Sequence, residues 1–243
     1  MPQKDDYAID LNEVDYTIKD IHILKQITGS IPNGKITAVV GPSGAGKTTL
    51  FRLMNGLKSP TAGEIYIQGK HIDHYPPVEL RRKVGLALQD ATMLPGTIRD
   101  NLALPRTLQG NDLTDNEAHS FLERVGLKGK NLKGNVKDLS GGERQKLSLG
   151  RTLVNQPEIL LLDEITSSLD SISRRDIEKL IVNMNQKNDT TIIWITHNLD
   201  QAKELGDYIW VMMDGYLVES GDDNILEKTT NERVLRFAKG EIE

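Results

Sequence analysis

The sequence predicts an α/β fold with a mixed β-sheet core, an antiparallel β layer and a helical insert. Short runs dominated by apolar residues, at positions 36–40, 159–162 and 190–195, are typical of strands buried on both faces of a parallel sheet. Polar and apolar residues alternate over short stretches of residues 7–31, which indicates strands with one buried face. Strand signals stop over residues 90–138, where helical patterns replace them.

Length and charge limit the classes of function. At 243 residues, the chain has room for one large α/β domain with a small insert. With 30 Lys and Arg against 35 Asp and Glu, its net charge of -5 offers no general attraction to nucleic acid or anionic lipid. No apolar run approaches the roughly 18 residues of a spanning helix, so we expect no direct membrane insertion.

The chain start bears on cellular location, and the absence of cysteine excludes several kinds of site. Residues 1–6 lack the apolar segment of a signal peptide, which favours a cytoplasmic location. The chain contains no cysteine, which excludes disulfides, thiolate catalysis and cysteine-based zinc sites.

A glycine-rich loop is the feature around which the chain is organised. Residues 41–48 fit the phosphate-loop pattern G-x-x-x-x-G-K-[ST], between a predicted strand and a helix predicted over residues 48–57. The backbone N–H groups of such a loop turn inward around phosphate oxygens. Lys47 supplies a positive charge for the β- and γ-phosphates, and Thr48 offers a hydroxyl to Mg²⁺. The predicted nucleoside triphosphate site comprises Gly41, Pro42, Ser43, Gly44, Ala45, Gly46, Lys47, Thr48 and Thr49.

Two side chains on predicted strands are further candidates. Tyr16 lies in the predicted antiparallel layer, and residues 63–70 continue this layer. The Tyr16 ring can either stack on an adenine or pack in the core. Gln89 follows a short strand at residues 84–88, at the sheet edge where α/β proteins bind ligands. Its amide can reach a Mg²⁺ ion or a water molecule, or it can simply cap the strand.

The insert contains helices and a connecting segment. A short helix begins at Thr97, and Thr114 with Glu117 forms a capping box that opens a helix through Val125. Residues 127–137 are rich in glycine and lysine, and this composition predicts a solvated linker rather than a basic binding patch.

A second anion site is predicted at the start of the next helix. Ser140 is a good N-cap, and Glu143 stands three residues later in a capping-box arrangement. Between them, Gly141 and Gly142 leave backbone N–H groups bare, although glycine costs roughly 1 kcal/mol relative to alanine inside a helix. This pattern indicates that another group approaches the backbone closely, whereas an ordinary capping box needs no glycines.

Charged residues follow two of the buried strands. Asp163 and Glu164 end the strand at residues 159–162, and side chains that alternate in direction should have different roles. One carboxylate can hold Mg²⁺ through water, and the other can take a proton from the attacking water. His197 follows the strand at residues 190–195, from where it can donate to the γ-phosphate.

The remaining segments predict structure rather than chemistry. Residues 167–170 form a turn, and the helix after it carries an apolar stripe that we expect to be core. Residues 208–219 predict a hairpin with a tight Asp-Gly turn, and the tail resembles a surface helix. The apolar stripe of the helix after residues 167–170 consists of Ile177, Leu180, Ile181 and Met184.

Taken together, these motifs resemble the ATP-binding subunit of ABC transporters. The resemblance implies one P-loop NTPase domain over residues 1–243, with a helical insert at about 90–138 and a signature helix at about 139–154. Its motifs occur here in the family's order: Walker A (41–48), Q-loop (Gln89), signature (139–145), Walker B (159–163), catalytic glutamate (Glu164), D-loop (167–170) and switch histidine (His197). Tyr16 falls at the adenine-stacking position.

The resemblance also implies cofactors and partners. ATP and Mg²⁺ would be bound, with Thr48, Gln89 and Asp163 near the metal. Two subunits would close head to tail on ATP binding, so that Ser140 and Gly142 cap the nucleotide of the other copy. A separate transmembrane permease subunit would receive the motion, which places this chain on the inner face of the membrane.

A narrower resemblance concerns the transported substrate. Residues 163–170 carry Ile165 where most members have proline, and with residues 94–102 they are similar to the ATPases of bacterial iron-efflux systems. Phosphate-importer ATPases are the second candidate. Gly150 and Asn198 replace the commoner Ala and Asp, but neither position supplies a catalytic atom.

Two rival functions stay open. A soluble, non-transport member of the superfamily would typically carry two cassettes or a long coiled coil, and the sequence has neither. A catalytically inactive module is disfavoured because Lys47, Asp163, Glu164 and His197 are intact.

Overall fold

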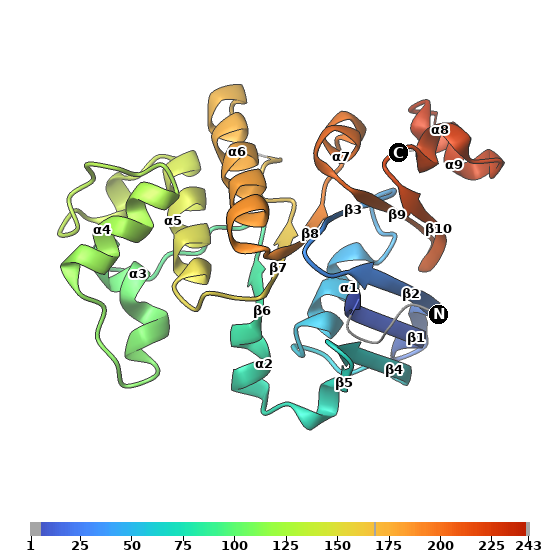
Figure 1. Cartoon of the computed structure of the whole chain (residues 1–243), viewed down its shortest axis with the longest axis horizontal. Helices are drawn as coiled ribbons and strands as arrows, with labels where there is room; N and C mark the ends of the chain where they lie inside the picture. Colours follow the sequence, from blue (N-terminus) through green and yellow to red (C-terminus); the bar gives the residue numbers. More distant parts are fainter. Residues whose placement is uncertain (1–5, 168, 242–243) are drawn as a thin grey trace.

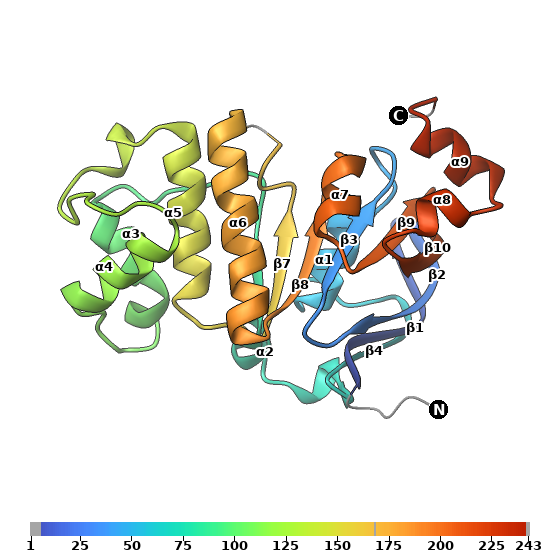
Figure 2. The same cartoon turned by 45° about the horizontal axis from the view of Figure 1, so that its top comes forward.

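The computed structural model describes residues 6–167 and 169–241. Figures 1 and 2 show a β-sheet lobe and a helical lobe, with the long helix α6 (Ser171–Asn188) between them. No helix in these two ranges combines the length and the apolar character required to cross a bilayer.

A six-stranded mixed sheet forms the centre of the molecule. Its strand order is β10-β9-β3-β8-β7-β6, and all neighbours are parallel except β9 and β10, which form the predicted hairpin. Every residue of β3, β7 and β8 is buried, as the apolar runs predicted. The strands are β3 (Ile36–Val40), β6 (Val84–Ala87), β7 (Ile159–Asp163), β8 (Thr191–Ile195), β9 (Tyr208–Met213) and β10 (Tyr216–Asp222).

The predicted antiparallel layer is a separate four-stranded sheet. Its order is β2-β1-β4-β5, with every pair antiparallel. One hydrophobic cluster joins residues of this sheet, the central sheet and helix α1, so α1 packs between the two sheets. These elements are β1 (Tyr7–Ile18), β2 (Ile21–Pro32), β4 (Ala62–Ile67), β5 (Lys70–His71) and α1 (Lys47–Met54).

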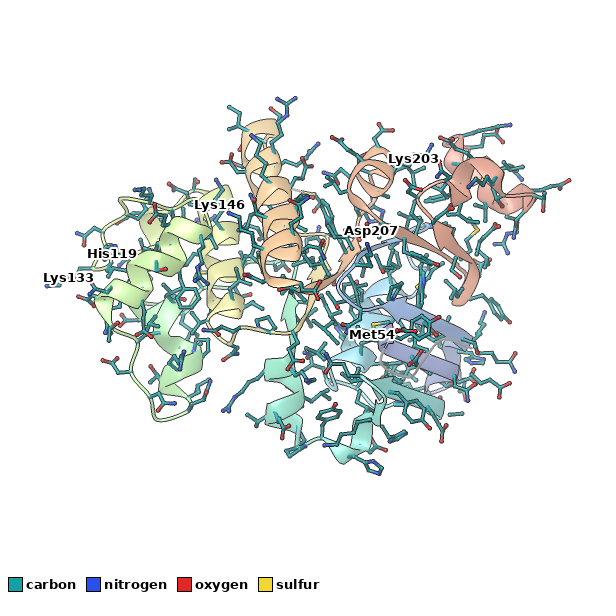
Figure 3. All side chains as sticks on the ribbon, viewed as in Figure 1. Met54, His119, Lys133, Lys146, Lys203 and Asp207 are labelled. Atoms are coloured by element: carbon teal, nitrogen blue, oxygen red, sulfur yellow. The ribbon has the colours of Figure 1, made fainter. Side chains whose placement is uncertain are left out.

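Helix α1 is shorter than the sequence predicted. It ends at Met54 rather than Leu57, because Gly56 adopts a left-handed φ of 68° and the Leu57 amide bonds back to the Arg52 carbonyl at 2.9 Å. Leu57 is consequently 51% exposed and is not part of the apolar face. Met54 lies inside the sheet lobe (Figure 3), where it is fully buried.

The hydrophobic core of the helical insert is continuous with residues of the central sheet and of α6. Helices α3, α4 and α5 each begin with a complete capping box, at Thr97, Thr114 and Ser140. In Figure 3, His119 and Lys133 lie on the outer side of this lobe. The elements of this region are α2 (Pro77–Lys83), α3 (Ile98–Thr107), α4 (Asp115–Arg124) and α5 (Gly141–Leu153), with short 3₁₀ helices at Ile72–His74 and Val136–Asp138.

The segment 127–137 is not the solvated linker that its composition predicted. Leu127, Leu132 and Val136 are at most 5% exposed and belong to the core of the insert. Asn135 also forms a β-bridge with Thr97. Apolar residues spaced four or five positions apart anchor the segment, while its lysines remain at or near the surface.

The C-terminal half supplies the remaining helices. Ile177 and Ile181 of α6 are fully buried as predicted, but Leu180 and Met184 are only partly buried. The tail forms two short helices instead of one surface helix, and both are anchored by buried side chains, including Phe237, that pack against β3 and β9. These helices are α7 (Leu199–Leu205), α8 (Ile225–Lys228) and α9 (Glu232–Ala238).

Candidate active site

The sheet topology brings the predicted active-site residues to one edge. Strands β3, β8 and β7 are parallel neighbours, so their carboxyl ends meet at the same side of the sheet. The phosphate loop follows β3, His197 follows β8, and Asp163 and Glu164 follow β7. Three segments distant in sequence therefore form one site.

The phosphate loop depends on glycine at two close contacts. A Cβ atom on Gly41, where φ is 147°, would lie 1.9 Å from the Met212 carbonyl oxygen. One on Gly46, where φ is 95°, would lie 2.7 Å from a methyl group of Leu24. A Cβ on Gly44 would instead meet nothing within 4 Å, so the outer side of the loop is open. The loop is thus packed on its inner side and accessible at the side where phosphates would bind.

Lys47 is held inside the loop. Its side chain donates to the carbonyl oxygens of Gly41 at 2.6 Å and Pro42 at 2.8 Å, and the residue is only 5% exposed. Burial lowers the pKa of the Lys47 ammonium, whereas the charges of Glu164 and Asp163 act in the opposite direction. Because carbonyl dipoles compensate a buried cation only partly, phosphate oxygens would be better partners.

Thr48 and Asp163 meet across the site. The Thr48 hydroxyl donates to Asp163 Oδ1 at 3.1 Å, and Asp163 is 4% exposed. Burial raises the pKa of the Asp163 carboxyl, although the hydrogen bond from Thr48 lowers it. A hydroxyl and a carboxylate at this spacing fit a Mg²⁺ ion, which prefers oxygen ligands and keeps several waters.

Glu164 turns away from its neighbour, as strand alternation predicted. Its Oε1 lies 2.6 Å from His197 Nε2, while Asp163 faces Thr48. Glu164 has a left-handed φ of 51°, which costs a non-glycine residue about 1–3 kcal/mol and is typical of functional sites. The Glu164 amide also bonds to the Ile195 carbonyl at 3.2 Å, so β8 fixes this turn.

Gln89 is connected to the same turn through Ser167. Gln89 Nε2 donates to Ser167 Oγ at 3.1 Å, and Ser167 Oγ donates to the Glu164 carbonyl at 2.9 Å. This contact uses the amide nitrogen of Gln89 and leaves its oxygen for other ligands. Ser168, within the predicted D-loop turn, lies outside the described residues.

Tyr16, the candidate for adenine stacking, packs in the core of the sheet lobe. It is 8% exposed and belongs to the hydrophobic core, where its hydroxyl accepts from Lys58 Nζ at 2.7 Å. The same ammonium lies 4.9 Å from the centre of the ring. These contacts favour the competing interpretation, packing within a strand, and adenine stacking by Tyr16 stays a prediction.

The helix start at Ser140 has the predicted capping box. The requirement for glycine at position 142, however, comes from a contact within the same chain. Ser140 and Glu143 exchange both hydrogen bonds, at 2.9 and 3.2 Å. A Cβ on Gly142 would lie 3.0 Å from Ser173 Oγ of the same chain, so α6 is the group that approaches closely. Gly141 faces open space, with nothing near its Cβ position.

Ser140 and the phosphate loop do not form one site within a single chain. In both Figure 1 and Figure 2, α6 lies between α5, which Ser140 caps, and α1, which follows the loop. The backbone N–H groups at Gly141 are consequently available to a group outside this chain.

Sequence reasoning missed Gln201, a residue that positions the histidine segment. Gln201 is 7% exposed; its Oε1 accepts from the Thr196 hydroxyl at 2.8 Å, and its Nε2 donates to Glu178 at 2.5 Å. The network ties the residue before His197 to the middle of α6. A single polar residue in an amphipathic helix gave no sequence signal of this contact.

Replacing Gln201 by leucine should destabilise the protein. The variant leaves the buried Thr196 hydroxyl and a Glu178 oxygen without these partners, which should lower the free energy of unfolding by about 1–3 kcal/mol. Urea unfolding measures the change, with Gln186→Leu on the exposed side of α6 as the control. Equal stability of both variants would show that the network contributes nothing.

Comparisons with known proteins agree with this geometry. Residues 24–167 match the family described as ABC transporter. The chain is 45% identical over 219 residues to the Bacillus subtilis protein YjkB, named as an ABC transporter ATP-binding protein, covering 90% of this chain and 87% of the relative. It is 38% identical to the glycine betaine/carnitine transport protein GbuA of Listeria monocytogenes (86% of this chain, 54% of the relative). It is 37% identical to the methionine import protein MetN 1 of the same species (92% and 68%).

Solved structures show the same fold. The cassette MJ0796, in a dimeric post-hydrolysis state bound to ADP and Pi, has a TM-score of 0.78 and 28% identity, covering 88% of this chain and 98% of that chain. CbiO1 from Clostridium perfringens, part of an ABC transporter complex, has a TM-score of 0.79 and 28% identity, covering 97% and 99%. The chain belongs to the ABC transporter family, as an ATP-binding subunit with the cassette fold and ATPase activity.

Proposed function

We propose that this chain hydrolyses ATP to power transport through a separate transmembrane partner. The observation that carries the proposal is the convergence of Lys47, Thr48, Asp163, Glu164 and His197 at one edge of the central sheet. The transport proteins among its relatives support the coupling of that ATPase to a membrane subunit.

Each residue has a role that follows from its position. Lys47 exchanges its carbonyl partners for β- and γ-phosphate oxygens, while the backbone N–H groups of the loop surround the phosphates. Thr48, Asp163 and the free oxygen of Gln89 would hold Mg²⁺, with Asp163 acting mainly through water. When bound, this ion would neutralise charge that develops on the phosphates.

The reacting water would be handled by Glu164. Its carboxylate, oriented by His197 at 2.6 Å, accepts a proton from the attacking water. His197 lies at the same edge and can donate to a γ-phosphate oxygen once its contact with Glu164 opens. The two neighbouring carboxylates therefore divide metal binding and proton transfer between them.

A homodimer formed on ATP binding would explain the isolated helix start at Ser140. The backbone N–H groups at Gly141 and Gly142, with the Ser140 hydroxyl, would meet the nucleotide held by the partner's phosphate loop. Each of the two ATP sites would then contain groups from both chains, which a mixing experiment can test.

Mixing two inactive variants should restore activity. Lys47→Ala removes the phosphate contact, and Gly141→Asp places a negative charge at the signature helix without an internal clash. Each variant alone should have little ATPase activity, whereas a mixed dimer contains one site with neither change. We expect an equimolar mixture to recover up to about a quarter of wild-type activity, because half the dimers are mixed and each has one of two sites intact. No recovery, with both variants folded, would contradict a head-to-tail dimer.

The partner and the cargo are inferred from the position of one segment and the similarity of another. We infer that the membrane subunit docks around residues 89–99, between the sheet lobe and the helical lobe, which places the chain at the inner face of the membrane. The similarity of residues 163–170 to iron-efflux ATPases favours a metal ion such as iron as the cargo. Phosphate is the alternative cargo, and two relatives are named for glycine betaine/carnitine and methionine.

A pull-down distinguishes transport from a soluble role. Tagged Glu164→Gln protein is purified from detergent-solubilised membranes with ATP and Mg²⁺, and co-purifying proteins are identified by mass spectrometry. A multi-spanning membrane protein supports transport, and its iron and phosphate binding can then be measured. Recovery of ribosomal or DNA-bound proteins instead would contradict the transport proposal and leave the ATPase assignment intact.

A further inference from the structure

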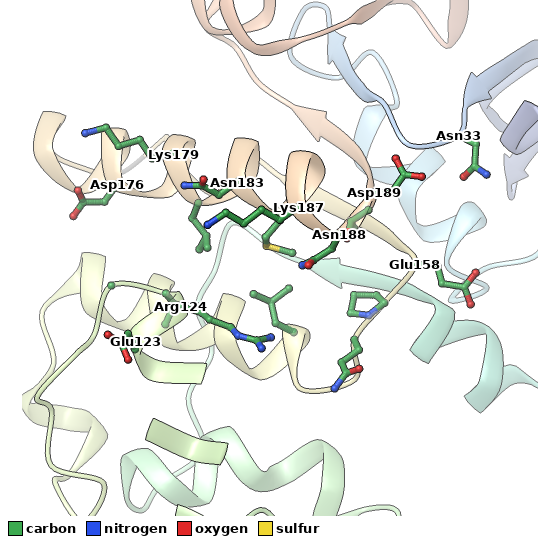
Figure 4. A pocket seen from close by; sticks show the side chains of 18 of the residues that line it. Asn33, Glu123, Arg124, Glu158, Asp176, Lys179, Asn183, Lys187, Asn188 and Asp189 are labelled. Atoms are coloured by element: carbon green, nitrogen blue, oxygen red, sulfur yellow. The ribbon is translucent and has the colours of Figure 1, made fainter. Parts of the chain in front are cut away.

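A large cleft in the described part of the chain lies away from the ATP site. It has a volume of about 1130 Å³ and opens between α6 and the ends of α4 and α5 (Figure 4). Pro157 and Glu158 precede β7, and Asp189 and Thr190 precede β8, so the cleft lies at the amino ends of the strands. The phosphate loop is at their carboxyl ends, so the cleft and the ATP site lie at opposite ends of the strands.

One face of α6 forms a wall of this cleft. Only Ile177 and Ile181 of the helix are buried, although it spans 18 residues. The cleft is lined by another side of α6, which carries Lys179, Leu180, Asn183, Met184 and Lys187 at helical spacing. Partly buried apolar side chains alternate there with exposed polar ones.

The charges around the cleft are unevenly compensated. Three of its carboxylates are paired with lysines that do not line it: Glu123 with Lys128 at 2.5 Å, Glu158 with Lys83 at 2.7 Å and Asp176 with Lys146 at 2.8 Å. Asp189, at the end of α6, is the exception, because no ion pair is found for it in the described part of the chain.

The cations of the cleft lack such partners. Within residues 6–167 and 169–241, no carboxylate lies at ion-pair distance from Arg124, Lys179 or Lys187. The Arg124 guanidinium lies over the ring of Phe121, 5.3 Å from its centre. Figure 4 shows Arg124 and Lys187 pointing from opposite walls into the space between the helices. Three cations without ion-pair partners therefore stand against one such carboxylate, Asp189, which leaves the cleft with an excess of positive charge.

We propose that this cleft binds an acidic peptide segment of a partner protein. Carboxylates of the segment would pair with Arg124 and Lys187, and its apolar side chains would pack on Leu180, Met184 and Leu153. The volume exceeds the roughly 300–1,000 Å³ of small-molecule pockets, which favours a peptide over a single anion. Amide side chains, which both donate and accept, suit a peptide backbone. They are Asn33, Gln68, Gln156, Asn183 and Asn188.

A labelled peptide of alternating glutamate and leucine, about 10 residues long, tests the proposal by fluorescence anisotropy. We expect Arg124→Gln/Lys187→Gln to weaken its binding at least about tenfold, and added salt to weaken binding to the wild type. Lys19→Gln/Lys239→Gln, which removes the same charge from distant exposed sites, should change the affinity less than about twofold. A peptide with glutamine in place of glutamate should not bind, and basal ATPase activity should be unchanged in both variants.

Several results would overturn the proposal. Equal affinity of the two double variants would place the peptide elsewhere on the surface. Equal binding of the glutamine peptide would remove the role of charge, and complete displacement by inorganic pyrophosphate at an equal concentration would indicate a small-anion site. Self-association that only the cleft variant abolishes would identify a second copy of this chain as the occupant. Hydrogen exchange of the wild type should show protection at the ends of α4 and α6, and protection elsewhere counts against the cleft.

Discussion

Glu164→Gln should reduce ATP turnover by about 100- to 10,000-fold, because the amide cannot accept the proton of the attacking water. The substitution preserves the size of the side chain and a hydrogen-bonding partner for His197, so the turn with its left-handed φ of 51° should be retained. ATP binding depends on Lys47 and Thr48 and should remain. The variant should therefore accumulate as an ATP-bound dimer.

Two measurements test this prediction together. Phosphate release gives the turnover number, and size-exclusion chromatography with ATP and Mg²⁺ shows the dimer. Glu204→Gln, an exposed carboxylate on α7, is the matched control and should behave as the wild type. If Glu164→Gln turned over ATP at a near-normal rate, another group would have to be the base.

Lys47→Met should abolish productive ATP binding without destabilising the ligand-free protein. Charge-assisted hydrogen bonds to phosphate contribute about 1.5–3 kcal/mol each, so we expect ATP affinity to fall at least about tenfold and turnover about 100-fold or more. The ammonium is buried against two carbonyl oxygens, and an unbranched apolar side chain fits the same space.

The lowered pKa of Lys47 indicates whether Lys47→Met raises or lowers the stability of the ligand-free protein. Because burial lowers this pKa below its ordinary value of 10.5, the unfolded chain binds the proton more tightly than the folded one. The charged ammonium consequently destabilises the ligand-free fold at neutral pH, and this effect is relieved only as the pH rises toward 10.5. Replacing Lys47 by methionine removes the effect, so the variant should be as stable as the wild type or more stable at pH 7.

Thermal unfolding with and without ATP and Mg²⁺ separates the two effects. The wild type should gain stability with the nucleotide, whereas Lys47→Met should start at an equal or higher midpoint and gain nothing. Lys19→Met, at an exposed position, should respond to ATP as the wild type does. A ligand-free midpoint well below that of the wild type would mean that the Lys47 contacts support the loop itself.

Local sequence patterns predicted much of the fold and the location of the nucleotide site. Continuous apolar runs predicted β3, β7 and β8, because short runs of this kind are typical of strands buried on both faces. Capping boxes at Thr114 and Ser140 predicted helix starts to the residue, because the hydrogen bonds involved span only three positions. The residue types of the phosphate loop and of the strand ends predicted a nucleotide site before any contact was known.

Only the tertiary structure decided which side chains meet. Tyr16 is buried against Lys58 from a later part of the chain, and strand alternation cannot tell a buried ring from one that faces a ligand. Residues 127–137 look like a linker by composition, yet three spaced apolar side chains enter a core that α3, α4 and α5 share with α6 and the central sheet. Gln201, Ser173 and the cleft beside α6 depend on contacts between segments far apart in sequence. A local pattern records propensity and periodicity, whereas burial and pairing depend on where the rest of the chain packs.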